Sequence, residues 1–158
     1  MTTYTARPIP AEVLAELRTA DDAGRSLTAV PDTEGGSPLR CCLRHSTPGE
    51  SIALVSYAPL RRWAAETGAD PAAYDEQGPV FIHAEACPGP AGDALPFTDD
   101  HRTLRRYSAD GRILGGRLVA GPETFPPALT EAFADPEVAL VHVRAVEYGC
   151  FLYEVRRG

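Results

Sequence analysis

Short connections between strand-like segments constrain the fold of this chain most. Residues 102–107 and 112–119 are both strand-like, and Ala109-Asp110-Gly111 between them is typical of a hairpin turn. Residues 138–146 and 150–155 are likewise separated by only a few residues. Connections this short allow antiparallel pairing, whereas parallel strands need a long crossover. The pattern therefore predicts a mostly antiparallel sheet.

Helix signals are few and do not alternate with the strands. At residues 10–18 a proline in the first turn precedes an apolar stripe, and residues 126–133 form a second helical pattern that ends before Asp135-Pro136. We interpret the chain as one α+β domain, residues 1–158, with a curved, mostly antiparallel sheet of about seven or eight strands and two or three helices packed on it. The remaining expected strands are at 26–30, 39–44, 51–57 and 78–87, and we expect 39–44 and 51–57 to pair as a hairpin. We also expect a short helical excursion within 59–76 and a loop at 88–100.

The composition argues against two classes of partner. The chain has 158 residues, 44% of them hydrophobic, and no apolar run is long enough to span a membrane. Its N-terminus lacks the basic and then apolar pattern of a signal peptide, so we expect a cytoplasmic protein with no membrane partner. The formal net charge of −7 disfavours nucleic acid as a partner.

The basic side chains restrict the chemistry further. All 15 are arginine, and lysine is absent, which excludes Schiff-base catalysis and a P-loop lysine. An anion held by a side-chain cation would be held by guanidinium, which suits bidentate binding of carboxylate or phosphate. We therefore expect a small anionic ligand, with Arg40, Arg106, Arg144 and Tyr57 as candidate substrate-binding residues.

Two strand-like segments each carry polar groups on one face. In residues 78–87, alternation places Phe81, His83, Glu85 and Cys87 together, opposite an apolar row. In residues 138–146, His142 and Arg144 share a face by the same period. Polar groups in a core cost free energy unless they have partners, so such rows mark either a site or a solvent-facing side of the sheet. If the two faces converge, both imidazoles line one hollow.

The residues of such a hollow suggest acid/base chemistry. His83 or His142 would act as general acid and base, because an imidazole titrates near neutral pH, and Glu85 would orient it. Cys42 or Cys87 would be a nucleophile beside a protonated histidine. We expect no cofactor in this interpretation.

A zinc site is the alternative. His83, Cys87, His142 and Cys150 offer two nitrogen and two sulfur ligands, drawn from two hairpins. No Cys-x-x-Cys pair occurs, so the spacing does not confirm such a site. Cys41 and Cys42 are adjacent, and on a strand they would point to opposite faces, so only one of them would join a given site.

Several motifs together resemble a bacterial family known as domain of unknown function 1203. They are Arg40-Cys41-Cys42-Leu43-Arg44, Gly78-Pro79-Val80-Phe81-Ile82-His83-Ala84 with Cys87, Leu104-Arg105-Arg106-Tyr107, and Val141-His142-Val143-Arg144 with Tyr148-Gly149-Cys150-Phe151. The resemblance implies no activity. It implies that Cys41 and His45 are features of this chain, and that five positions belong to the family pattern: Cys42, His83, Cys87, His142 and Cys150.

Two functions remain open at this point. The first is a small, cofactor-independent bacterial enzyme that acts on an anionic small molecule. The second is a non-catalytic module that binds a small ligand or a partner, with or without a Cys/His zinc site. A homodimer is compatible with either function, because a hairpin-rich sheet offers an exposed edge.

Overall fold

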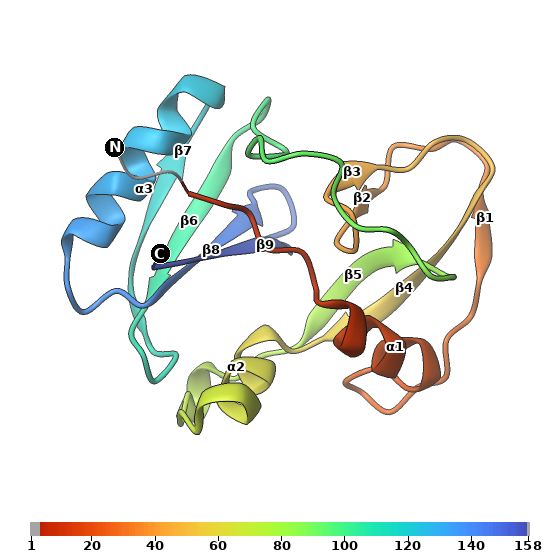
Figure 1. The fold of residues 1–158 in the computed structure, drawn as a ribbon, viewed down its shortest axis with the longest axis horizontal. Helices are drawn as coiled ribbons and strands as arrows, with labels where there is room; N and C mark the ends of the chain where they lie inside the picture. Colours follow the sequence, from red (N-terminus) through yellow and green to blue (C-terminus); the bar gives the residue numbers. More distant parts are fainter. Residues whose placement is uncertain (1–3, 158) are drawn as a thin grey trace.

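The computed structural model describes residues 4–157. They form an α+β fold with two mostly antiparallel sheets side by side (Figure 1), which confirms the predicted class, although the strands divide between two sheets instead of forming one. The elements are α1 (Ala11–Thr19), β1 (Val30–Asp32), β2 (Pro38–Leu39), β3 (Arg44–His45), β4 (Glu50–Tyr57), α2 (Pro59–Thr67), β5 (Gly78–His83), β6 (Arg102–Tyr107), β7 (Ile113–Val119), α3 (Phe125–Ala134), β8 (Leu140–Ala145) and β9 (Phe151–Arg156), with short 3-10 turns at Ala72–Tyr74 and Pro122–Thr124.

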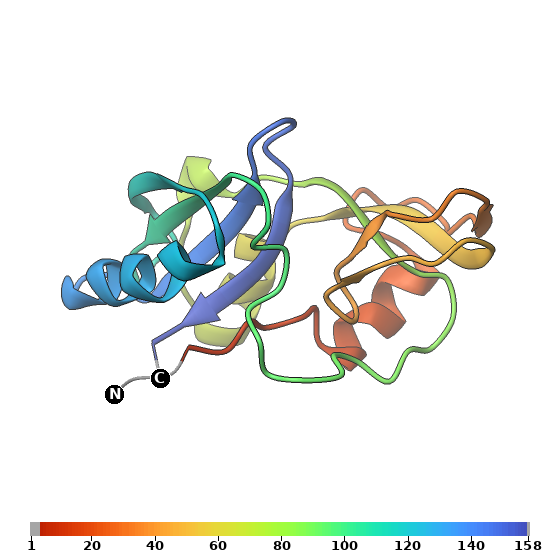
Figure 2. The ribbon, with the colours of Figure 1, turned by 90° about the horizontal axis from the view of Figure 1, so that it is seen from above.

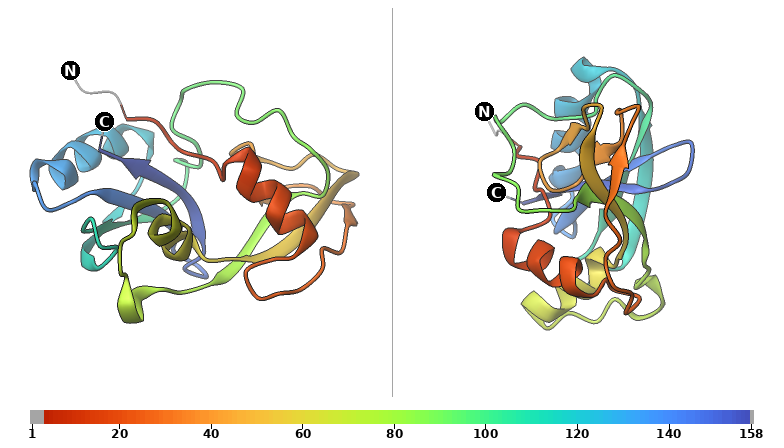
Figure 3. Two further views of the ribbon diagram at one scale, coloured as in Figure 1. Left: turned by 60° about the horizontal axis from the view of Figure 1, so that its bottom comes forward. Right: turned by 90° about the vertical axis from the view of Figure 1, so that its right-hand side faces the viewer.

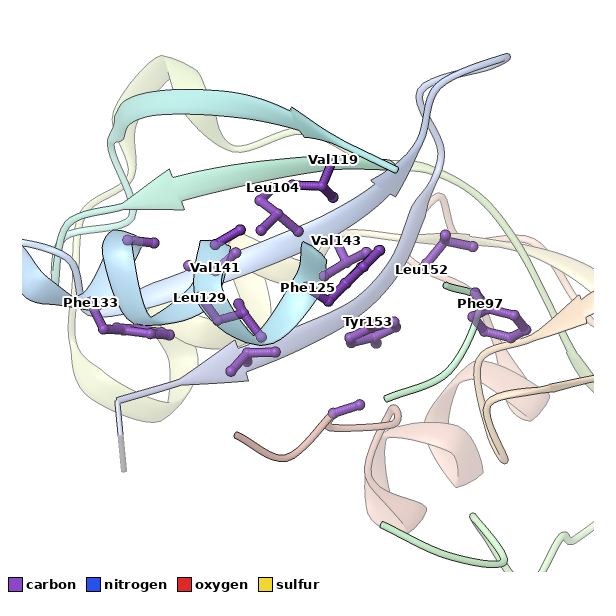
Figure 4. Packing of buried hydrophobic residues seen from close by; sticks show 14 of the residues in the cluster. Phe97, Leu104, Val119, Phe125, Leu129, Phe133, Val141, Val143, Leu152 and Tyr153 are labelled. Carbon is purple, nitrogen blue, oxygen red and sulfur yellow. The ribbon is translucent and has the colours of Figure 1, made fainter. Parts of the chain in front are cut away.

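The C-terminal half of the chain forms the four-stranded sheet. Its order is β7-β6-β8-β9, every pair is antiparallel, and β6–β7 and β8–β9 are the two predicted hairpins. Helix α3 covers one face, because Phe125, Leu129 and Phe133 recur at helical spacing and are all buried. They pack against Val141 and Val143 of β8, as Figure 4 shows.

The N-terminal half forms the five-stranded sheet, in the order β1-β4-β5-β2-β3. Helix α1 lies against one face of it (Figure 3), where Leu14 and Leu17 join a core that includes Val55 and Ile82. The predicted hairpin between residues 39–44 and 51–57 is wrong, because β4 pairs along its two edges with β1 and β5.

The two sheets are joined by buried contacts between distant segments. The N-terminal segment forms a bridge from Arg7 to Glu154 and then donates the Ile9 N–H to the Arg40 carbonyl at 3.0 Å. The Arg40 guanidinium, which is 3% exposed, donates from Nε to the Phe151 carbonyl at 2.8 Å. These bonds hold the N-terminal segment and the turn after β2 against β9.

A long irregular segment, residues 84–101, runs from the end of β5 to the start of β6. Figure 2 shows it in green, crossing from one half of the molecule to the other. Phe97 anchors its far end in the core of the four-stranded sheet (Figure 4), and the Phe97 carbonyl accepts a bond from Arg102 Nε at 2.8 Å. Within residues 4–157, no helix combines the length and the apolar character needed to cross a membrane.

Candidate metal centre

A tight turn places two adjacent thiols on the same side of the chain. Residues 39–44 do not form the predicted strand, because the backbone turns after Leu39, and the Leu43 N–H bonds the Leu39 carbonyl at 2.9 Å. Leu43 takes a positive φ of 58° in this turn. The Cys41 and Cys42 Sγ atoms are consequently 3.9 Å apart. The expectation that only one of them joins a given site is therefore wrong.

The end of β5 brings the remaining groups to these thiols. His83 Nδ1 lies 3.2 Å from Cys41 Sγ and 3.8 Å from Cys42 Sγ. The strand ends at His83, so the predicted alternation does not continue through residue 87, and the turn that follows returns Cys87 to the cluster. One ligand atom from each of Cys41, Cys42, His83 and Cys87 lies within 4.8 Å of the others.

The spacing of the Cys41, Cys42 and His83 ligand atoms fits one tetrahedral metal ion, and Cys87 Sγ lies within 4.8 Å of all three. Zinc–sulfur bonds of about 2.3 Å and zinc–nitrogen bonds of about 2.0 Å at tetrahedral angles place two sulfurs about 3.8 Å apart and a sulfur and a nitrogen about 3.5 Å apart. The observed separations are 3.9 Å between Cys41 and Cys42 and 3.2 and 3.8 Å from these thiols to His83. Three sulfurs and one nitrogen form a donor set that zinc prefers.

A carboxylate outside the cluster orients the imidazole. His83 Nε2 lies 2.7 Å from Glu50 Oε2, and Arg44 binds both oxygens of Glu50 at 2.8 Å. Arg44 first, and then the Thr47 backbone N–H, hold the pKa of Glu50 well below its usual range. An ionised Glu50 accepts the proton of Nε2, which leaves the Nδ1 lone pair toward the thiols, as in zinc sites where a carboxylate supports a histidine ligand.

The thiols differ in acidity. The hydrogen bond between the two adjacent thiols lowers the pKa of the Cys41 thiol to about 5 against the effect of burial, and the His83 backbone N–H adds to this. The same bond and burial raise the pKa of Cys42, and burial raises that of Cys87. These shifts favour the thiolate at Cys41 over those at Cys42 and Cys87, and a metal that binds all three sulfurs must displace the protons they still carry.

His142 is far from this chemistry. It belongs to the four-stranded sheet, is fully buried between the rings of Tyr107 and Phe151, and its Nε2 lies 3.0 Å from Glu154 Oε1. Burial lowers its pKa. The expectation that His83 and His142 line one hollow is therefore wrong, because α3 covers one face of β8 and α2 packs over the other.

The alternative ligand set is corrected in the same way. Cys150 lies in the loop between β8 and β9, where its nearest polar partner is the Tyr148 carbonyl, 4.0 Å away. His142 and Cys150 thus stay outside the cluster, and Cys41 and Cys42 take their places beside His83 and Cys87.

The other predicted site residues are distributed over the molecule. Glu85 is exposed at the rim of an open cavity of about 330 Å³ that Cys42, His83 and Cys87 also line, but Glu50 and not Glu85 bonds the imidazole. Glu85 does not share a strand face with His83, because β5 ends at His83.

The candidate anion-binding residues are not near the cluster as a group. Arg40 bonds backbone carbonyls, and burial lowers its pKa to about 10. Arg106 lies over Gly115 on β7, where a Cβ atom would collide with its guanidinium. Tyr57 and Arg144 line a separate cavity between the sheets. Of the predicted catalytic residues, Cys42, His83 and Cys87 are brought together.

The fold and this cluster define an α+β protein with a three-cysteine, one-histidine centre. Over residues 36–157 the chain matches the family described as protein of unknown function (DUF1203), and it belongs to that family, which confirms the resemblance seen in the sequence. The matched segment contains all four cluster residues. No curated protein and no solved structure matches the chain.

Proposed function

We propose that this protein binds one zinc ion through Cys41, Cys42, His83 and Cys87. The observation that carries the proposal is the convergence of four ligand atoms within 4.8 Å, with the imidazole already oriented by Glu50. Thiols persist in reducing compartments, and the proposal is consistent with a cytoplasmic protein.

The role of the ion would be structural. Four protein ligands complete a tetrahedral site and leave no position for substrate, which is typical of structural zinc. The ligands come from the turn after β2, the end of β5 and the start of the segment 84–101. Zinc would therefore attach the near end of this irregular segment to the five-stranded sheet, while Phe97 anchors its far end.

Acid/base catalysis on an anionic small molecule is the second candidate. It is supported by the open cavity of about 330 Å³ that His83 lines together with Cys42, Glu85 and Cys87. The two candidates compete for the same imidazole, because a metal-bound Nδ1 and a Glu50-bound Nε2 leave no nitrogen free for proton transfer. A chain that cannot bind zinc would favour the enzyme.

Metal analysis of the full chain separates the candidates. We expect the protein purified under reducing conditions to carry one zinc per chain and, after removal of zinc, to bind cobalt(II) with the absorption bands of thiolate ligation and tetrahedral geometry. Cys87→Ser should weaken cobalt binding at least tenfold.

Cys150→Ser is the matched control, because Cys150 lies outside the cluster. It should bind cobalt as the parent chain does. Equal loss in Cys150→Ser and Cys87→Ser, or a chain that binds neither metal, would overturn the proposed site.

A further inference from the structure

A second site lies between the two sheets, apart from the thiol cluster. A cavity of about 170 Å³ opens where the end of β4, the entry to β5 and the β8–β9 loop meet. Tyr57, Val80 and Phe151 supply apolar walls, and Glu76 and Arg144 supply charge. The cavity thus combines an apolar lining with an ion pair.

Arg144 is positioned to receive a planar anion. Its side chain is 12% exposed, and its Nε donates to the Gly149 carbonyl at 2.8 Å, which fixes the plane of the guanidinium. Among residues 4–157 the ionic partner of Arg144 is Glu76, with 3.1 Å between Arg144 Nη1 and Glu76 Oε1. A guanidinium can bind a carboxylate through two parallel bonds, and here one oxygen of Glu76 meets it.

Glu76 is shared between two cations. The same Oε1 atom accepts a bond from Arg105 Nη1 at 3.0 Å. One carboxylate therefore faces two guanidinium groups, which leaves a local excess of positive charge in a chain whose formal net charge is −7. The Glu76 side chain is 48% exposed and belongs to the irregular segment before β5, so water competes for it.

We propose that this cavity binds a small organic carboxylate. The carboxylate would pair with Arg144 in a bidentate way and displace Glu76 from it, and the carbon part would lie against Tyr57 and Phe151. The cavity is smaller than the roughly 300–1,000 Å³ typical of sites for larger ligands, which suits a short-chain acid. This site shares no residue with the proposed zinc centre and does not depend on it.

Titration of the full chain, as purified, with propionate tests the site. Amide NMR should show saturable shifts at Gly78 and Gly149, which line the cavity. Glu76→Gln should tighten propionate binding at least threefold, because it removes the competing internal carboxylate, and a misfolded variant cannot produce that gain. Arg144→Gln should weaken binding at least tenfold.

Arg117→Gln is the control, because Arg117 is an exposed residue paired with Glu131 of α3. It should leave propionate binding unchanged. Inorganic phosphate is the comparison anion and should bind more weakly than propionate. The proposal is overturned if neither the parent chain nor Glu76→Gln shows saturable shifts, if Glu76→Gln binds no more tightly than the parent, or if phosphate binds as well as propionate.

Discussion

At the scale of the residue, His83 connects the thiols to the charged groups around them. Its Nδ1 faces Cys41 and Cys42, and its Nε2 bonds Glu50, which Arg44 holds from the outside. This chain of contacts fixes the tautomer that can ligate a metal. The orientation of one imidazole therefore depends on an ion pair at the start of β4.

Replacement of Glu50 tests this dependence. Glu50→Gln should lower zinc affinity about 10- to 100-fold, because the Nε2–H loses its anionic acceptor while all four ligands stay in place. Competition with a chromogenic chelator measures the change. Glu137→Gln, at an exposed position after α3, is the control and should not alter affinity. Equal affinities for the parent and Glu50→Gln would contradict the supporting role of Glu50.

The buried His142–Glu154 pair predicts acid sensitivity. Burial lowers the pKa of His142 below 6.5, so the unfolded chain takes up this proton first, and the stability contributed by neutral His142 is present above pH 6.5 and lost below it. Burial opposes the ionisation of Glu154, but the bond from His142 and the charge of Arg156 hold its pKa below 4.5, which adds a loss of stability at lower pH.

Urea unfolding between pH 7.5 and pH 5.5 checks the contribution of His142. The parent chain should lose stability across this range, and His142→Gln, which does not titrate, should lose less. Because the thiol cluster is the same in both chains, its own pH dependence cancels in the comparison. Identical pH profiles would show that His142 does not set the acid sensitivity.

The candidate site was only partly predictable from residue patterns. His83 and Cys87 were identified because polar side chains share one face of an otherwise apolar segment, whereas Cys42 was a candidate nucleophile and a position of the family pattern. Strand alternation allowed only one of Cys41 and Cys42 in a site, and the family pattern favoured Cys42. Alternation does not apply in this turn, which contains no glycine or proline to reveal it. Glu50 was missed because its contact with His83 joins residues on different strands, and strand pairing cannot be inferred from either strand alone.

At the scale of the element, the segment 84–101 is the part of the chain that the proposed zinc ion would hold in place. It has no regular secondary structure; Cys87 attaches its near end at the cluster, and Phe97, with Leu95 beside it, attaches its far end to the core. Segments of this length without structure of their own open easily unless their ends are held. Loss of the attachment at Cys87 should therefore increase the local opening of this segment.

Removal of the metal tests whether it holds this segment in place. Treatment with a chelator should make residues 88–96 the first site of limited proteolysis, whereas the zinc-loaded chain should resist cleavage there. Mass spectrometry of the fragments locates the cuts. Cleavage at the same rate with and without chelator would mean that the cluster does not hold this segment.

Local signals explain which elements were predicted well. Helices α1 and α3 and the hairpins β6–β7 and β8–β9 were identified because their periodicity and turns are encoded within a few residues. The five-stranded sheet was not, since β2 pairs in parallel with β5, and β1 pairs with β4 across residues 33–49. Those pairings depend on contacts between segments far apart in the sequence.

At the scale of the whole molecule, the two sheets are expected to unfold as one domain. The buried Arg40 bonds β9 from the turn after β2, and Phe151 packs in the core of the five-stranded sheet. Homodimerisation, a small-molecule partner and the absence of nucleic-acid or membrane partners remain predictions from the sequence.

Two probes can follow the two sheets separately. Trp63 packs beside Tyr107 and bonds the Ala109 carbonyl at 2.8 Å, so its fluorescence reports the four-stranded sheet. Absorption of cobalt in the cluster reports the five-stranded sheet. In a single cooperative domain both signals change at the same denaturant concentration. Separated midpoints would show two independently stable halves.

X-ray absorption at the zinc edge of the purified chain tests the central claim most directly. The account predicts one zinc per chain, with three sulfur neighbours at about 2.3 Å and one nitrogen neighbour at about 2.0 Å. A zinc surrounded only by oxygen and nitrogen, or a chain that takes up no zinc, would contradict it.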